Sequence, residues 1–197
     1  MKKLFIIGGM GAGKSTASRA LTDQGLPLID LDKVGHDILM WEVVKEELGE
    51  AFGDDIFGDD GEIIRPALAA KAFRTPADTR KLNRITMPRI EEAYTDRMRE
   101  LEAAGTDAVV VEYSAFKNRE TSLAYSADVV IAVLAPTDVR IERAVASGFE
   151  EDDVRRRIAR QITDADRVEA ADVVFNNNSS KDELYNKVLA WWESYAE

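Results

Sequence analysis

The chain has 197 residues, 45% hydrophobic and 32% charged, a composition typical of a soluble globular protein rather than a disordered one. Compared with the about 150 residues of an average domain, this length favours one domain over residues 1–197 with an elaboration. A net charge of −11 disfavours general nucleic-acid binding. The sequence has no cysteine and one histidine, His36, which excludes disulfides, thiolate zinc sites and histidine-rich metal centres.

No segment approaches the about 18 consecutive apolar residues of a membrane-spanning helix. The apolar run at residues 4–7 is also shorter than the about 7–15 residues of a signal-peptide core. We therefore expect a cytoplasmic protein that does not act at a membrane.

In chain order, the first elements are expected as a buried strand at 4–7, a helix at 15–21, a strand at 26–29, helical periodicity from 38 to 48, and surface loops at 52–61. The following segment, 62–104, contains no strand pattern and is expected to be mainly helical. Its prolines, Pro66, Pro76 and Pro88, are expected near helix starts. We interpret this segment as a helical insertion.

The second half contains three strand patterns, at 108–111, 129–134 and 173–175, and helical patterns at 139–146, 152–161 and 181–195. Five buried strands joined by helical crossovers predict an α/β fold, a five-stranded parallel sheet with helices on both faces.

The strongest motif lies between the first strand and the first helix. Residues 8–15, Gly-Gly-Met-Gly-Ala-Gly-Lys-Ser, fit the phosphate-binding pattern Gly-x-x-x-x-Gly-Lys-Ser/Thr. Glycines allow backbone N–H groups to surround a phosphate, and the next helix points its positive end at the same charge. We expect Lys14 to reach the β- and γ-phosphates and the Ser15 hydroxyl to bind Mg²⁺. The nucleotide-binding residues expected here are Gly9, Gly11, Ala12, Gly13, Lys14, Ser15 and Thr16.

The sequence lacks the Asn-Lys-x-Asp segment of a GTPase, which favours a small-molecule kinase that uses ATP. Asp30 and Asp32 follow the second strand, where ligands of parallel sheets gather. In an extended segment both carboxylates face the same way, so one can orient an acceptor hydroxyl while the other holds water on Mg²⁺. The alternative is that one of them caps the following helix.

Taken together, these features resemble the dephospho-CoA kinase family over nearly the whole chain. The matching segments are 8–16, 29–32, Phe52-Gly53, Gly61 with Arg65, Leu68 and Phe73, Leu82-Asn83, Pro88, Arg157-Ile158 with Gln161, Arg167, and 171–178. The resemblance implies ATP-dependent phosphorylation of the ribose 3′-hydroxyl of dephospho-CoA. It also implies a P-loop kinase core, an acceptor-binding insertion at 62–104 and a lid region at 143–160.

The resemblance further implies roles for two residues, Arg65 in acceptor binding and Asn177 beside the adenine, and among the arginines of the lid Arg143 is our candidate for phosphoryl transfer. Arginines are dense in this region, at positions 140, 143, 155, 156, 157 and 160. They suit phosphoryl oxygens, and they equally suit a solvated helix face that balances the acidic residues 150–153. Glu112 is a candidate carboxylate near Mg²⁺, or a cap or salt-bridge partner.

Three positions depart from the family pattern: Met87 before Pro88, Lys117 in place of a carboxylate, and Ser147 in place of a lid arginine. They leave two alternatives, another small-molecule or nucleoside monophosphate kinase, and a nucleotide-binding regulatory protein without rapid transfer. The expected partners are ATP and dephospho-CoA, with no nucleic acid and no membrane, and the expected state is a monomer or weak homo-oligomer.

Overall fold

The computed structural model describes residues 1–196, and they form two compact units. The sheet unit contains residues 1–30 and 102–196, and the helical unit is Leu31–Leu101. The helical unit starts well ahead of the segment 62–104 that the sequence singles out. The reason is a shared hydrophobic core, because the helices directly after Leu31 pack with those after Ile64.

The predicted five-stranded parallel sheet is confirmed. Within residues 1–196 the strand order is β2-β3-β1-β4-β5, and every pairing is parallel. The strands are β1 (Lys2–Gly8), β2 (Leu28–Asp30), β3 (Ala108–Tyr113), β4 (Val129–Leu134) and β5 (Val173–Asn176). The three central strands are almost fully buried, as expected for a parallel sheet covered by helices.

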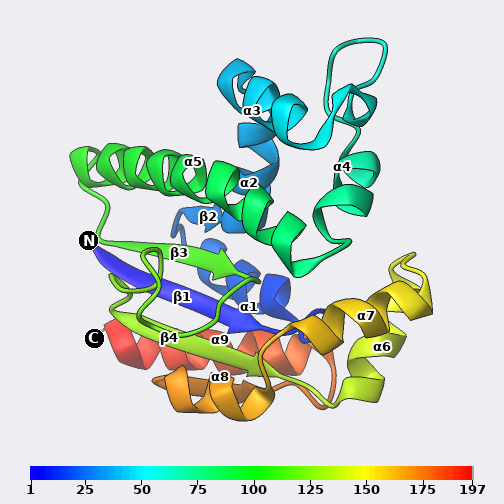
Figure 1. Cartoon of the computed structure of the whole chain (residues 1–197). Helices are drawn as coiled ribbons and strands as arrows, with labels where there is room; N and C mark the ends of the chain where they lie inside the picture. Colours follow the sequence, from blue (N-terminus) through cyan, green and yellow to red (C-terminus); the bar gives the residue numbers. More distant parts are fainter. Residues whose placement is uncertain (197) are drawn as a thin grey trace. The chain divides into compact units, whose positions relative to one another are not determined.

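Helices α1 (Lys14–Thr22) and α9 (Lys181–Ala196) cover one face of the sheet (Figure 1). Their buried side chains, among them Leu21 and Leu184, pack against Leu4, Ile6 and Ile131. Helix α8 (Asp164–Ala170) contacts β1 and β4, and the right-handed crossover from β4 to β5 places it on the other face.

Helices α6 (Thr137–Ala146) and α7 (Glu151–Arg160) contact each other as an antiparallel pair after β4. We call them the α6–α7 hairpin. Helix α8 is missing from the sequence-based prediction, although its start carries a readable signal. Thr163 and Asp166 form a capping box, in which each side chain accepts the other residue's backbone N–H.

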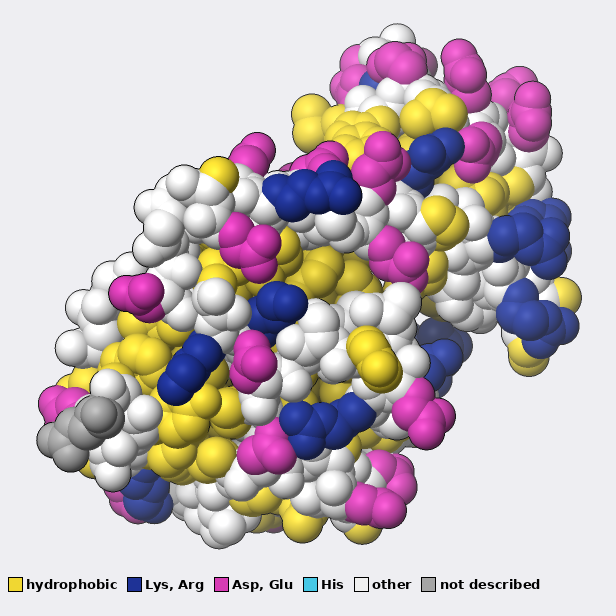
Figure 2. Space-filling view, turned by 90° about the vertical axis from the view of Figure 1, so that its left-hand side faces the viewer, with side chains coloured by type: hydrophobic (Ala, Val, Ile, Leu, Met, Phe, Trp, Pro, Cys, Tyr) yellow, Lys and Arg dark blue, Asp and Glu magenta, His cyan; other side chains and the backbone are white. Residues whose placement is uncertain are grey.

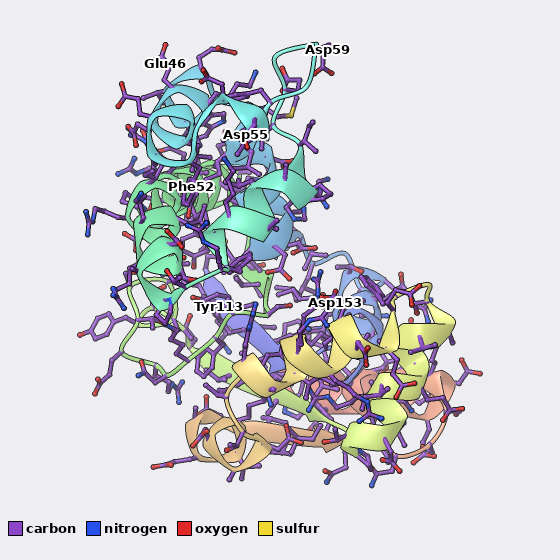
Figure 3. All side chains as sticks on the ribbon, turned by 45° about the vertical axis from the view of Figure 1, so that its right-hand side comes forward. Glu46, Phe52, Asp55, Asp59, Tyr113 and Asp153 are labelled. Atoms are coloured by element: carbon purple, nitrogen blue, oxygen red, sulfur yellow. The ribbon has the colours of Figure 1, made fainter. Side chains whose placement is uncertain are left out.

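The helical unit contains α2 (Leu31–Asp37), η1 (Ile38–Met40), α3 (Glu42–Phe52), η2 (Asp54–Ile56), α4 (Arg65–Ala72) and most of α5 (Pro76–Ala103). Its core is built around Val44, Leu48, Ile56 and Leu68, with Phe52 at the end of α3 (Figure 3). The expectation of surface loops throughout 52–61 is therefore wrong in part, because this segment contains η2 and Ile56 is fully buried in the core.

The expectation that Pro88 lies near a helix start is wrong, since it lies inside α5. Proline lacks an N–H, so the carbonyl of Arg84 loses its helical donor. Buried residues lie on both sides of the break, Thr86 before it and Tyr94 after it, and their packing maintains the helix. Pro66 and Pro76 do stand at helix starts.

On the face shown in Figure 2, Lys and Arg side chains are interspersed with Asp and Glu, and no continuous basic surface is present there. None of the helices in the described part of the chain is long and apolar enough to cross a membrane.

Candidate functional site

The phosphate-binding loop joins β1 to α1, as the motif predicts. Helix α1 begins at Lys14 directly after the loop, and the Ala12 N–H donates to the Gly9 carbonyl at 3.1 Å to close a tight turn. The first N–H groups of a helix have no intrahelical acceptor and carry the positive end of the helix dipole. The loop and the start of α1 therefore form an anion-binding site.

Glycine is required in this loop for two different reasons. Gly11 and Gly13 have φ values of 76° and 108°, which side chains other than glycine rarely adopt. Gly9 has no such backbone requirement. A Cβ on Gly9 would fall closer than 3.0 Å to the guanidinium of Arg140, and a Cβ on Gly13 would meet the amide of Asn177 equally closely. The loop conformation thus depends on residues far away in the sequence.

Two carboxylates lie at the carboxyl ends of neighbouring strands beside the loop. Asp30 is the last residue of β2 and is paired in register with Glu112 of β3. The Ser18 hydroxyl, which is buried in α1 and lies 3.0 Å from the Lys14 carbonyl, donates to Glu112 Oε2 at 2.8 Å. Glu112 therefore connects β3 to the helix that carries Lys14 and Ser15.

The premise that Asp30 and Asp32 share one face of an extended segment is wrong. The strand ends at Asp30, and Asp32 is the second residue of α2. The chain turns into a helix at Leu31, so the two-residue periodicity of a strand does not continue. Asp30 belongs to the sheet unit and Asp32 to the helical unit, and their separate roles stay a prediction.

Arg143 and Asn177 meet at the loop that follows β5. Arg143 donates from Nη1 to the Asn177 carbonyl at 3.2 Å and from Nη2 to the Ser179 carbonyl at 3.0 Å. The Asn177 side chain is 3% exposed, and its amide donates to the Ala12 carbonyl at 2.8 Å. Its Oδ1 is buried and accepts no hydrogen bond from the described residues. Asn177 thus joins the phosphate-binding loop to the segment after β5.

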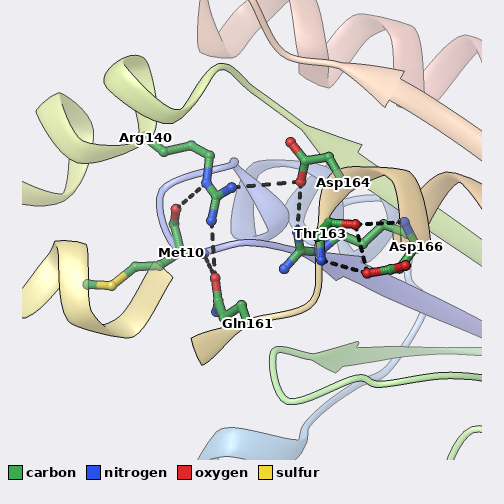
Figure 4. A network of polar contacts seen from close by, with 7 residues as sticks. Met10, Arg140, Gln161, Thr163, Asp164 and Asp166 are labelled. Atoms are coloured by element: carbon green, nitrogen blue, oxygen red, sulfur yellow. Dashed lines mark hydrogen bonds and ion pairs between the residues drawn. The ribbon is translucent and has the colours of Figure 1, made fainter. Parts of the chain in front are cut away.

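Two residues that contact the phosphate-binding loop, Arg140 and Gln161, were not identified individually from the sequence (Figure 4). Arg140 is 4% exposed and donates from Nε to the Met10 carbonyl at 2.9 Å. The Met10 N–H donates to Gln161 Oε1 at 3.0 Å. In the sequence, Arg140 is one of several arginines and Gln161 only a family match, so nothing local marks them as partners of the loop.

The arginines of α7 pair mainly with their own helix. Arg155 contacts Glu151, and both Arg156 and Arg157 contact Asp153, which Figure 3 labels. The hydrogen bond from Arg157 holds the pKa of the Asp153 carboxyl below its usual value. For these arginines the structure favours the solvated helix face over a set of phosphoryl ligands.

Arg65 is the first residue of α4 and is exposed. It lines a surface cavity of about 240 Å³ within the helical unit, together with His36, Asp37, Leu39, Met40, Glu62 and Ile63. The lining combines apolar side chains with Arg65 and two carboxylates, Asp37 and Glu62, and the role of Arg65 in acceptor binding stays a prediction.

The residues beside the loop are compatible with Mg²⁺. No group of three or more His, Asp or Glu side chains that could hold a metal ion occurs among residues 1–196. Mg²⁺ in kinases keeps several waters and uses one or two protein ligands plus substrate phosphates, so it needs no such group. Ser15 is exposed in the first turn of α1, and the Asp30–Glu112 pair supplies carboxylates of the preferred chemistry.

Comparison with known proteins identifies the family. The dephospho-CoA kinase family model matches residues 4–183. A dephospho-CoA kinase of Corynebacterium efficiens is 44% identical over 186 residues, which are 93% of this chain and 92% of that protein. The solved structure of TT1252 from Thermus thermophilus has a TM-score of 0.82 at 26% identity, covering 98% of this chain and 97% of that one. Dephospho-CoA kinase from Campylobacter jejuni shares the fold, with a TM-score of 0.67 at 19% identity over 98% and 96% of the two chains.

Proposed function

Because the chain belongs to the dephospho-CoA kinase family, we propose that it transfers the γ-phosphoryl group of ATP to the ribose 3′-hydroxyl of dephospho-CoA. The family match over residues 4–183 carries this proposal, since it includes the phosphate-binding loop and the whole helical unit. The substrates are ATP and dephospho-CoA, and the product is coenzyme A.

On the ATP side, the loop residues Gly9 to Thr16 surround the phosphates, and the Lys14 ammonium neutralises charge on the β- and γ-phosphoryl oxygens. Phosphoryl transfer requires little covalent chemistry from the protein, so positioning and electrostatic stabilisation dominate. The Lys14 side chain is 8% exposed, and a charge held away from water acts more strongly than an exposed one.

When bound, Mg²⁺ would supply positive charge that neutralises the phosphoryl oxygens of ATP. The Ser15 hydroxyl would hold it directly. Asp30 and Glu112 would hold its water ligands from the ends of β2 and β3. Ser18 donates to Glu112 and so keeps that carboxylate oriented.

On the acceptor side, Asp32 orients the ribose hydroxyl and accepts its proton, and Arg65 binds an anionic group of dephospho-CoA. Asp32 and Arg65 both belong to the helical unit. Among the other cations of the insertion, Lys71 contacts Asp55, Lys81 donates to the Ala51 carbonyl, and Arg89 contacts Glu47. Arg65, Arg80 and Arg84 are exposed, and of these three we assign acceptor binding to Arg65.

We assign the lid to residues 143–160, on the α6–α7 hairpin. Arg143 holds the carbonyls of Asn177 and Ser179, so contact with a transferring phosphoryl group requires it to leave them. In this arrangement it positions the adenine side of the site. We further propose a cytoplasmic monomer or weak homo-oligomer that binds no nucleic acid, consistent with the net charge of −11.

The test is a panel of acceptors assayed for ATP turnover, containing dephospho-CoA, shikimate, gluconate and nucleoside monophosphates. We expect transfer to dephospho-CoA alone. Calorimetry of Arg65→Glu should show at least about tenfold weaker binding of dephospho-CoA and unchanged ATP binding. Arg97→Glu, a matched charge reversal on α5, should affect neither.

Transfer to another acceptor, or no binding of dephospho-CoA to the wild type at millimolar concentration, would refute the proposed substrate. Met87 and Lys117, which depart from the family pattern, are then the positions to exchange first.

A further inference from the structure

Both ends of the α6–α7 hairpin form hydrogen bonds with the backbone of the same residue of the phosphate-binding loop, Met10. Arg140 lies near the start of α6, and Gln161 is the residue that ends α7. Arg140 Nε donates to the Met10 carbonyl at 2.9 Å, while the Met10 N–H donates to Gln161 Oε1 at 3.0 Å. Arg140 Nη2 also donates to Gln161 Oε1 at 3.1 Å, which closes a ring of three hydrogen bonds (Figure 4).

Arg140 is an expensive residue to bury, so its placement needs compensation. Desolvation lowers the pKa of its guanidinium, Asp164 opposes this, and Arg167 adds to it. The Asp164 carboxylate lies 3.7 Å from Arg140 Nη1 and 2.7 Å from Arg167 Nη1, so Arg167 is its nearer partner. The hydrogen bonds to Met10 and Gln161 therefore replace much of the hydrogen bonding with water that the Arg140 guanidinium loses on burial.

These contacts determine the loop conformation from outside. The Met10 N–H points to Gln161, so this peptide is turned away from the phosphate set and defines the outer edge of the loop. Gly9 must lack a side chain because the guanidinium of Arg140 occupies that space. Gly11 faces the backbone of Arg140 in the same way. Three consecutive loop residues are thus fitted to one arginine.

We propose that Arg140, together with Gln161, is a positioning residue that forms the phosphate-binding loop before ATP arrives and fixes the base of the α6–α7 hairpin to it. This rests on the proposed function only in that the loop binds ATP. A loop that is already formed spares ATP the cost of ordering it, so the contribution appears in ATP affinity. Because the backbone of Met10 is hydrogen-bonded to both ends of the hairpin, any shift of Met10 on nucleotide binding moves α7 as well.

The first test measures ATP affinity by calorimetry at a temperature where every variant is folded. Arg140→Met removes the two hydrogen bonds that the guanidinium donates, to Met10 and to Gln161, and keeps much of the apolar stem. We expect ATP to bind about tenfold more weakly, as for a binding-competent loop populated about a tenth of the time. Binding of dephospho-CoA should be unchanged. Arg97→Met, on the exposed face of α5, is the matched control and should leave both affinities unchanged.

Substitutions of Gln161 provide a second, milder test of the proposal if Arg140→Met does not fold. Gln161→Leu removes the acceptor shared by Met10 and Arg140 and should also weaken ATP binding. Gln161→Glu keeps an acceptor at that position and should restore it. The combination of Arg140→Met with Gln161→Leu should weaken binding by less than the product of the two single effects, because both disrupt one network.

Substitutions at Gly9 and Gly11 distinguish the effect of the Arg140 side chain on the loop from the effect of the Arg140 backbone. In the apoprotein, Gly9→Ala should lower the melting temperature in the wild type and cost little in an Arg140→Ala background. Gly11→Ala meets the backbone of Arg140 and a positive φ, so Arg140→Ala should not relieve it.

The proposal is overturned if Arg140→Met and Gln161→Leu melt at lower temperature but bind ATP within about twofold of the wild type, since that is a purely structural role. It is equally overturned if Arg140→Ala leaves the Gly9→Ala penalty intact. Failure of the acceptor panel would refute the proposed substrate and leave this result standing, whereas a wild type that does not bind ATP would refute both.

Discussion

Asn177 offers a test of nucleotide recognition, because its amide nitrogen makes a hydrogen bond within the described residues and its amide oxygen does not. The amide nitrogen donates to the Ala12 carbonyl at 2.8 Å, and a rotation by half a turn would place Oδ1 against that carbonyl instead. Two acceptors would then face each other, so the orientation is fixed. Oδ1 is left buried without a donor from residues 1–196. We predict that ATP binding makes this oxygen accessible and that it then accepts a hydrogen bond from the 6-amino group of the adenine.

A buried acceptor without a donor costs about 1–3 kcal/mol, and a ligand that supplies the donor recovers that amount. At about 1.4 kcal/mol for each factor of ten, this is a preference of about 5- to 140-fold for ATP over GTP, whose base carries an acceptor at the same position. Asn177→Ala removes this preference. It also removes the bond to Ala12, a net loss of about 1 kcal/mol that weakens both nucleotides equally.

The assay is competition of GTP against ATP, with dissociation constants measured for the wild type, Asn177→Ala and Asn178→Ala. Asn178 is exposed and adjacent in the sequence, so it controls for any general effect on the loop after β5. We expect the ATP to GTP ratio to fall toward one only in Asn177→Ala. If both affinities fall by the same factor and the ratio persists, Asn177 acts only by holding Ala12 and the adenine is recognised elsewhere.

Three further results are expected. Lys14→Ala should lower turnover by about a hundredfold or more, since a charge on the transferring group is lost, and near-normal turnover would contradict the role of the loop. Asp32→Asn should reduce kcat far more than it raises the KM for ATP, and steady-state kinetics showing an effect on ATP alone would place Asp32 at the metal. Burial tends to raise the pKa of Asp172, but Arg119 and the Val130 N–H outweigh it and lower that pKa below 3.8. This carboxylate therefore stabilises the fold above about pH 4 and ceases to do so as the pH falls through its lowered pKa. The gap in urea midpoint between wild type and Asp172→Asn should close over that range, and a gap that persists in acid would refute it.

Local patterns predict the sheet well, because a buried parallel strand is a continuous apolar run. Residues 4–7 and 129–134 are recognisable for that reason, and β4 has the predicted bounds. Helix α8 was missed because it has only seven residues and buries Arg167 rather than an apolar stripe. Periodicity does not detect such a helix, whereas its capping box does. The prediction for Pro88 fails for the opposite reason: the local signal for a helix start is present, but tertiary packing overrides it and the helix continues through the proline.

In the candidate site, too, features that depend on local sequence are predictable and contacts between distant residues are not. The motif at 8–15 is local in sequence, and the structure gives it the expected place between β1 and α1. The spacing of Asp30 and Asp32 is also local, but its interpretation depended on an extended backbone that ends one residue too early. Contacts such as that between Arg140 and Met10 join residues 130 positions apart, and no local pattern encodes them.

The motif therefore specifies that a phosphate can be bound, while residues outside it determine the conformation of the loop. Met10 is held by Arg140 and Gln161, Ala12 is held by Asn177, and Arg143 holds the segment that carries Asn177. Two of these residues lie on α6, one ends α7 and one follows β5, so the hairpin and the loop after β5 hold the phosphate site together. A substitution at the tip of the hairpin, such as Ser147, leaves every one of these contacts in place. Divergence in the lid is thus compatible with an intact ATP site, because the loop is anchored at the base of the hairpin and not at its tip.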